Sequence, residues 1–162
     1  MSATRFYLIR HGQVVNHHEF RYNGHSDVDI TDAGVEQMNR LADFLSAEPI
    51  AAIYSSDLQR ACKGAEIIGR SLGLKPERVA AFRELHLGRG EGLTRAEAAV
   101  KYPDEADFRF QDLVTGKIKE GESLVELGAR VRPALDGIAA RHRGQAVCLV
   151  AHGGVNRVIL SD

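Results

Sequence analysis

Two histidines stand directly behind apolar segments of the sequence, and each is followed by glycine. His11 comes after "FYLIR" (residues 6–10), and His152 comes after "AVCLVA" (residues 146–151). Neutral imidazole is a good nucleophile near pH 7, and histidine is often found at functional sites for this reason. Short apolar runs are typical of buried strands. We therefore expect two strands that carry their histidines to a common site.

Two arginines and two glycines fit the same chemistry. Arg10 precedes the first histidine, and Arg60 lies in "SSDLQRA". The guanidinium group is planar and permanently charged, and its geometry matches the oxygens of phosphate. Gly12 and Gly153 let backbone N–H groups approach a ligand closely, and a helix that begins near Gly153 would add its positive end. Either histidine motif alone would more often be an ordinary surface or core feature without a function. Together with the arginines, the two motifs predict a phosphate pocket.

Alternating strand and helix patterns predict the elements that would position these residues. Helical spacing of apolar residues follows Thr31, and it returns after Ser56 or Asp57, either of which can act as a helix N-cap. Alternation of this kind favours an α/β fold, a three-layer αβα arrangement with a mostly parallel central sheet. Ligands of such sheets bind beyond the carboxyl ends of the strands. The expected strands are residues 4–10, 50–54, 78–82 and 146–151, and capping boxes at Thr94 with Glu97 and at Ser123 with Glu126 begin further helices.

Composition and charge describe an ordinary globular chain and argue against several classes. The 162 residues fit one domain (residues 1–162), and the formal net charge of −1 provides no field that would attract nucleic acid or an anionic membrane. The longest apolar runs fall far short of the roughly 20 residues that a membrane helix needs. Cys62 and Cys148 lie among apolar neighbours, as expected of reduced core residues. We predict a cytoplasmic protein with no nucleic-acid or membrane partner.

Four motifs resemble, in order, those of the histidine phosphatase superfamily, which includes the phosphoglycerate mutases: "LIRHGQ", "SSDLQRA", "RELHLGRGEGLT" and "AHGG". The resemblance implies a phosphoglycerate mutase-like fold and chemistry that needs no metal or other cofactor. It implies that His11 becomes phosphorylated, while Arg10 and Arg60 bind the phosphoryl oxygens. His152 would hydrogen-bond the same oxygens. Glu84 would protonate the leaving alcohol and later activate water.

The polar loop at residues 16–30 is expected to form the rim of the pocket. Asn16 resembles a phosphate-contacting asparagine of the family, with its spacing offset by one residue. Arg21, Gly24 and His25 would face the substrate. The histidines and aspartates of this loop offer a metal site as an alternative, but a solvated polar loop explains them more simply.

The spacing between motifs distinguishes the branches of the family. Sixty-seven residues separate Glu84 from His152, and this short spacing resembles compact phosphatases rather than mutases, which carry a long insertion. The segment "RYNGHSD" (residues 21–27) resembles a loop of α-ribazole phosphatases, cobalamin-pathway enzymes that remove a 5′-phosphate. The resemblance implies a phosphomonoesterase that acts on a small-molecule phosphomonoester, with α-ribazole 5′-phosphate as one candidate. Phosphoglycerate mutase-type transfer and a catalytically silent phosphate-binding module stay open as alternatives.

The resemblance also implies a domain that is short at its C-terminus. The sequence ends at Asp162, whereas relatives usually continue with more helix and a further strand. A helix that begins near Val155 would then leave apolar surface uncovered. We expect self-association of this chain, for example as a homodimer.

Overall fold

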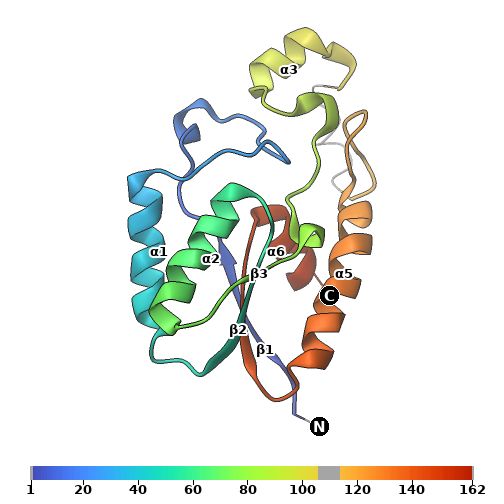
Figure 1. Cartoon of the computed structure of the whole chain (residues 1–162). Helices are drawn as coiled ribbons and strands as arrows, with labels where there is room; N and C mark the ends of the chain where they lie inside the picture. The colour runs from blue at the N-terminus through green and yellow to red at the C-terminus, as the bar shows by residue number, and fades with distance from the viewer. Residues whose placement is uncertain (1, 106–113, 162) are drawn as a thin grey trace.

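The central element is a parallel sheet. The computed structural model describes residues 2–105 and 114–161. Within them, β1 (Arg5–Arg10), β2 (Ile50–Ser55), β3 (Glu77–Arg78) and β4 (Ala146–Ala151) form one sheet in the order β1-β4-β2-β3. All three neighbouring pairs are parallel, which confirms the expected sheet type. Figure 1 shows β1, β2 and β4 side by side, with their carboxyl ends at one edge.

Helices and short turns connect the strands. The helices are α1 (Asp32–Leu45), α2 (Gln59–Leu72), α3 (Arg95–Lys101), α5 (Leu124–Arg141) and α6 (Gly153–Leu160). Short 3₁₀ turns occupy His17–Glu19, Ala80–Phe82, Gly88–Gly90 and Pro103–Glu105. In the described part of the chain, no helix is both long enough and apolar enough to cross a bilayer.

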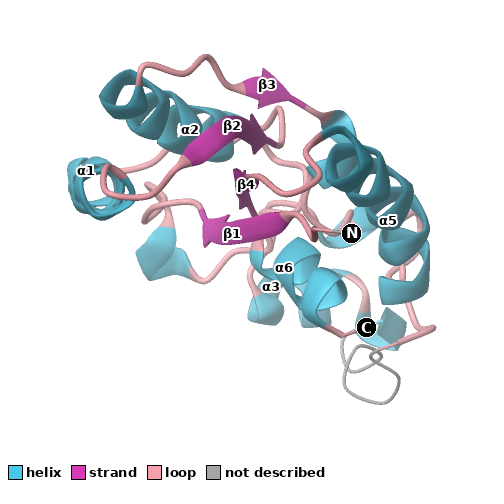
Figure 2. Cartoon of the chain, turned by 90° about the horizontal axis from the view of Figure 1, so that it is seen from below, coloured by secondary structure: helices cyan, strands magenta, loops and turns pink. Residues whose placement is uncertain are grey.

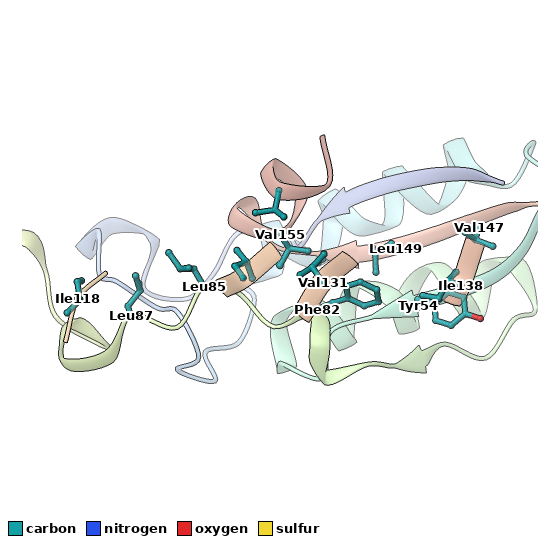
Figure 3. Close-up of a cluster of buried hydrophobic side chains, with 13 residues drawn as sticks. Tyr54, Phe82, Leu85, Leu87, Ile118, Val131, Ile138, Val147, Leu149 and Val155 are labelled. Atoms are coloured by element: carbon teal, nitrogen blue, oxygen red, sulfur yellow. The ribbon is translucent and has the colours of Figure 1, made fainter. Parts of the chain in front are cut away.

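Strand β4 is buried along its whole length and separates two clusters of core residues. Val147 and Leu149 pack with residues of α5 and α6 in the cluster of Figure 3. Cys148 and Val150 lie in a second cluster with residues of α1 and α2. Side chains alternate between the two faces of a strand, so a strand that is apolar throughout needs cover on both sides. Figure 2 shows this cover as helices on either side of the sheet, and the three-layer αβα fold is confirmed.

One expected strand is much shorter than its apolar pattern indicates. Residues 78–82 were expected to be extended, but β3 ends at Arg78, and the chain then enters the 3₁₀ turn at Ala80–Phe82. The reason is the length of its neighbour, because β2 ends at Ser55, which pairs with Arg78. The last hydrogen bond of the ladder joins the Val79 N–H to the Ser55 carbonyl at 2.8 Å. The chain then turns, and the Phe82 side chain enters the core, where it is fully buried.

The helix caps follow the sequence at three places and differ at one. The side chains of Thr31, Thr94 and Ser123 accept backbone hydrogen bonds as N-caps, the last two in complete capping boxes. Helix α2 instead begins after Leu58 with no capping side chain of its own. Asp27, from the loop before α1, accepts a hydrogen bond from the Gln59 backbone N–H at 2.6 Å. The Ser56 hydroxyl is engaged with His152, and the Asp57 carboxylate is engaged with Arg83.

Candidate active site

The two histidines lie beside each other because their strands are neighbours. Strands β1 and β4 pair in register, with Arg10 opposite Ala151. His11 continues this pairing, since its backbone N–H donates to the Ala151 carbonyl at 3.1 Å. The ring centroids of His11 and His152 are 5.2 Å apart. The expected convergence of the two histidines at the carboxyl edge of the sheet is therefore present.

His11 is oriented as a nucleophile. Its Nδ1 lies 2.8 Å from the carbonyl oxygen of Gly12. A carbonyl can only accept, so Nδ1 carries the hydrogen and Nε2 keeps its lone pair. Burial lowers the pKa of His11 to about 4, with the Gly12 hydrogen bond opposing this shift and the charges of Arg60 and Arg10 adding to it. The ring is therefore neutral at pH 7 and can attack an electrophile.

His152 lies deeper than His11 and is fully buried. Its Nε2 is 2.7 Å from the Ser56 hydroxyl oxygen, and its Nδ1 has no hydrogen-bond partner among the described residues. Burial, followed by the charge of Arg60, holds the pKa of His152 far below its usual value, so the ring is neutral. A buried ring nitrogen without a partner costs free energy, which a hydrogen bond to a bound ligand would recover.

Arg60 is a buried cation that forms no ion pair with a carboxylate of the described residues. Its side chain is 1% exposed, and it donates to the carbonyl oxygens of Ser26 at 2.8 Å and Gly24 at 2.6 Å. Burial lowers its pKa, against the attraction of carboxylates that include Glu84. Arg10 is exposed, and its side chain makes no hydrogen bond or ion pair with any residue that the structure describes. Both guanidinium groups therefore have charge available for an incoming anion.

The Glu84 carboxylate is held at the start of helix α6. Both of its oxygens lie 3.1 Å from the backbone nitrogen of Gly154, and one accepts from the Leu85 backbone at 2.8 Å. A side chain at position 154 would place its Cβ 2.3 Å from a Glu84 oxygen. Glycine is therefore required at this position for the carboxylate to reach the helix end.

These groups surround an open cavity of about 360 Å³. The expected site residues that line the cavity are Arg10, His11, Arg21, Gly24, Arg60, Glu84 and Gly153. Apolar side chains cover part of its wall, among them Val14, Leu85 and Leu124. The cavity therefore offers several cations and one carboxylate around a neutral imidazole.

Four expected site residues lie outside the cavity lining, each for a physical reason. His152 is behind His11, as described above. A Cβ at Gly12 would come within 2.5 Å of the Gly34 carbonyl oxygen, so this glycine serves the packing of α1 against the loop. The amide of Asn16 bonds that of Asn23 in both directions, at 2.7 and 3.1 Å. The His25 ring nitrogen Nε2 lies 2.8 Å from the Glu84 carbonyl oxygen, behind the carboxylate.

Among the lining residues that sequence reasoning did not assign to the site, three have polar side chains: Tyr22, Asn23 and Arg157. Arg157 is exposed on α6 and makes no hydrogen bond or ion pair within the described residues. Arg21 differs, because Glu19 and Glu97 neutralise it at 2.5 and 2.7 Å. One signal pointed to Arg157: it lies four residues after Gly153, and residues with this spacing share one face of a helix.

The loop histidines and aspartates do not form a metal site in the structure. No group of three His, Cys, Asp or Glu side chains is arranged to hold a metal ion within residues 2–105 and 114–161. Asp29 instead forms an ion pair with Lys63, and Asp27 caps α2.

The chain belongs to the histidine phosphatase superfamily, branch 1, whose family model matches residues 6–162. It is 39% identical over 158 residues to phosphoglycerate mutase-like protein 4 of Arabidopsis thaliana, covering 93% of this chain and 66% of that protein. It is 35% identical over 163 residues to the metal-independent phosphoserine phosphatase of the same plant, covering 98% and 68%. The chain thus spans about two thirds of the length of these relatives.

The fold is also similar to that of a solved phosphatase. A mycobacterial glucosyl-3-phosphoglycerate phosphatase, solved as a complex with VO3, superimposes with a TM-score of 0.86 at 32% sequence identity. The similarity covers 94% of this chain and 76% of that one.

Proposed function

We propose that this protein is a phosphomonoesterase that hydrolyses a small-molecule phosphate ester through a phosphohistidine at His11. The observation that carries the proposal is the environment of His11, a neutral ring with a free Nε2 beside the uncommitted charges of Arg10 and Arg60. Phosphoryl transfer is governed mainly by positioning and by stabilisation of charge on the transferred group. A neutral nucleophile between two cations meets both requirements.

In the first step, His11 Nε2 attacks phosphorus and the bond from phosphorus to the ester oxygen breaks. The protonated Glu84 carboxyl transfers its proton to the departing oxygen, so the alcohol leaves neutral. Arg10 and Arg60 bind the phosphoryl oxygens as negative charge shifts among them. In the second step, water attacks the phosphohistidine while Glu84 accepts a proton from that water. Inorganic phosphate leaves, and His11 and the protonated Glu84 are regenerated.

We assign His152 the role of a donor to the phosphoryl group. The Ser56 oxygen accepts a hydrogen bond from the Leu58 backbone N–H at 3.3 Å, and we assign its hydroxyl hydrogen to His152 Nε2, 2.7 Å away. A ring that accepts at Nε2 carries its hydrogen on Nδ1, the nitrogen without a partner among the described residues. Donation from this nitrogen to the transferred phosphoryl group would satisfy it.

Hydrolysis is favoured over the two alternatives on different grounds. A silent binding module would not need a nucleophile with a free lone pair beside a carboxylate. The similar proteins carry names of both kinds, a phosphoglycerate mutase-like protein as well as phosphatases of phosphoserine and of glucosyl-3-phosphoglycerate, so the support for hydrolysis over mutase-type transfer is the short spacing of 67 residues between Glu84 and His152. α-Ribazole 5′-phosphate is a further candidate substrate, and its support is the segment at residues 21–27, which lines part of the cavity.

A screen of phosphomonoesters with and without a chelator tests this function. The panel contains phosphoserine, 3-phosphoglycerate, glycerol 3-phosphate and α-ribazole 5′-phosphate, with release of inorganic phosphate as the readout. We expect release that survives the chelator and disappears in His11→Ala. Formation of 2-phosphoglycerate without phosphate release would assign a mutase. No turnover of any ester, with retained phosphate binding, would assign a silent module.

A further inference from the structure

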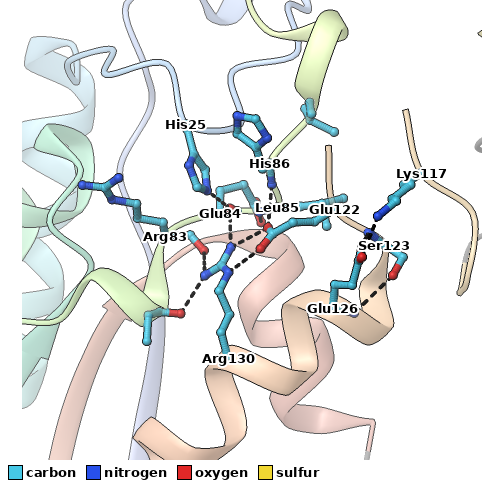
Figure 4. Close-up of polar contacts among 12 residues, drawn as sticks. His25, Arg83, Glu84, Leu85, His86, Lys117, Glu122, Ser123, Glu126 and Arg130 are labelled. Atoms are coloured by element: carbon cyan, nitrogen blue, oxygen red, sulfur yellow. Dashed lines mark hydrogen bonds and ion pairs between the residues drawn. The ribbon is translucent and has the colours of Figure 1, made fainter. Parts of the chain in front are cut away.

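Arg130 on α5 uses its whole guanidinium group to hold the segment that carries Glu84. Its Nη1 donates to the carbonyl oxygens of Ala81 and Arg83 at 2.7 and 2.8 Å. Its Nη2 donates to the Glu84 carbonyl oxygen at 2.8 Å. The remaining two donors bond the Glu122 carboxylate at 2.7 and 2.8 Å. A guanidinium group has five N–H donors, and all five are engaged in this network (Figure 4).

The held segment has no regular structure of its own. Residues 83–87 belong to no helix or strand, so no sheet neighbour fixes their backbone. Glu122 holds the other side of Glu84, because its carboxylate accepts from the His86 backbone N–H at 2.9 Å. The Glu122 backbone N–H donates in turn to the His86 carbonyl at 2.8 Å. Arg130 and Glu122 thus hydrogen-bond the backbone before and after the Glu84 side chain. In a sheet, a neighbouring strand would supply these hydrogen bonds.

The pair is screened from water and fixed in its charged form. The Arg130 and Glu122 side chains are 24% and 21% exposed. Burial by itself would raise the pKa of Glu122, but the hydrogen bonds from Arg130 and the His86 backbone reverse the shift and lower it. A bidentate pair of this kind has a defined geometry that lysine cannot reproduce.

We propose that Arg130 is a positioning residue that sets the reach of the Glu84 carboxyl group toward the leaving oxygen. The proposal rests on the proposed function, because it gives Arg130 a purpose only if Glu84 transfers a proton. A proton donor must lie within hydrogen-bond distance of its target, and misplacement of a reacting group by about 1 Å can cost about 10²-fold in rate. Loss of the Arg130 contacts leaves the Glu84 carbonyl held by the His25 ring, and this weaker support lets the carboxyl group shift.

The experiment compares the pre-steady-state burst for two leaving groups. An alkyl phosphate needs the proton from Glu84, whereas p-nitrophenyl phosphate releases an acidic phenol that leaves almost without help. In Arg130→Lys we expect the alkyl burst to slow roughly 10- to 100-fold and the aryl burst to change less than about threefold. Glu122→Gln keeps Arg130 in place and should give a smaller loss with the same selectivity, so it serves if the first variant folds poorly. Introducing Arg130→Lys into Glu84→Gln should cause little further loss.

Arg141→Gln is the matched control. Arg141 lies on the same helix and contacts the Tyr54 hydroxyl and Glu77, both at 3.2 Å, so its removal reports the general cost of losing an arginine from α5. We expect equal bursts for both leaving groups in this variant. Equal losses, or no loss, for both leaving groups in folded Arg130→Lys and Glu122→Gln would overturn the positioning role. Absence of a His11-dependent burst in the wild type would overturn the proposed function, and the positioning role with it.

Discussion

The carboxylate of Glu84 meets the backbone nitrogen of Gly154 with both oxygens at 3.1 Å. This contact ties an irregular segment to the first turn of α6, directly after the strand that ends in His152. The positive end of a helix attracts a carboxylate, so the helix that follows one histidine also locates the expected proton donor.

Gly154→Ala should disturb this contact more than it disturbs folding. The added methyl carbon would lie 2.3 Å from a Glu84 oxygen, so we expect kcat to fall roughly 10- to 100-fold with a smaller change in KM. Gly137→Ala is the control, because a Cβ at this position of α5 meets nothing within 4 Å. It should gain about 0.5–1 kcal/mol of stability and retain full activity. Similar kcat values for both variants would contradict the importance of the Glu84–Gly154 contact.

His11 should carry the phosphoryl group. Rapid quenching with labelled substrate should give an acid-labile, alkali-stable adduct that is absent from His11→Ala. The pKa of about 4 predicts that kcat/KM stays level as pH falls to about 5 and declines as His11 becomes protonated near pH 4. A decline of kcat/KM centred at pH 6.5 and caused by protonation of His11 would show that this imidazole has an ordinary pKa. An adduct that persists in His11→Ala would place the nucleophile elsewhere.

Arg60→Ala should lose roughly 10²–10³-fold in kcat/KM, the usual cost of removing a fixed donor to transition-state charge. Within residues 2–105 and 114–161 the buried guanidinium group has carbonyl partners but no carboxylate partner, so its charge is available to the phosphoryl group. Arg70→Ala removes an exposed arginine of α2 outside the cavity and should change kcat/KM less than about twofold. Equal kcat/KM values for the two variants would remove Arg60 from the phosphate site.

Arg157 should favour substrates with a second negative group. 3-Phosphoglycerate and glycerol 3-phosphate share a carbon skeleton but differ in a carboxylate, so their comparison isolates this charge. We expect Arg157→Gln to lower kcat/KM for 3-phosphoglycerate roughly tenfold, as for a lost hydrogen bond between charged groups, and to leave glycerol 3-phosphate unchanged. The Arg70→Gln variant should affect neither. Unchanged discrimination between the two substrates in Arg157→Gln would assign Arg157 another role.

Stability should decline in mild acid because both histidines are buried neutral. Their pKa values are lowered in the folded state, so below about pH 6.5 the unfolded chain binds protons that the folded chain excludes. Each histidine then contributes a loss of about 1.4 kcal/mol per pH unit as pH falls. For His11 the loss ends near pH 4. Denaturant melts of wild type and His152→Gln from pH 7 to pH 5 would measure this, and equal pH slopes for the two proteins would contradict it.

The sheet and the histidine pair could be predicted because their signals are local. A continuous apolar run identifies β1 and β4, and the residue after each run is fixed by the chain itself. The parallel arrangement then brings His11 and His152 together with no further information. The end of β3 could not be read in the same way, because it depends on the length of β2 at Ser55.

The support of Glu84 could not be predicted because its contacts are distant along the chain. Arg130 reaches back across 46 to 49 residues to three carbonyl groups, and no periodic pattern records such a contact. Asp27 at the start of α2 is a similar case, since the helix itself offers Ser56 and Asp57 as nearer candidates. Those two side chains have other partners, and this becomes visible only in the folded chain.

Because β4 is buried, local unfolding is harder at the histidine side of the site than at the segment that carries Glu84. The amides of β4 lie between β1 and β2, so their hydrogen exchange requires unfolding of the whole sheet. The segment at residues 83–87 lies outside any helix or strand and is held by side chains and a backbone hydrogen bond between Glu122 and His86, so it can exchange through a local opening. The histidine at the end of β4 is therefore placed by the most protected part of the fold, while the carboxylate opposite it can shift by small changes in α5. Substitutions around Glu84 can thus change which leaving groups the site accepts while the positions of His11 and His152 stay the same.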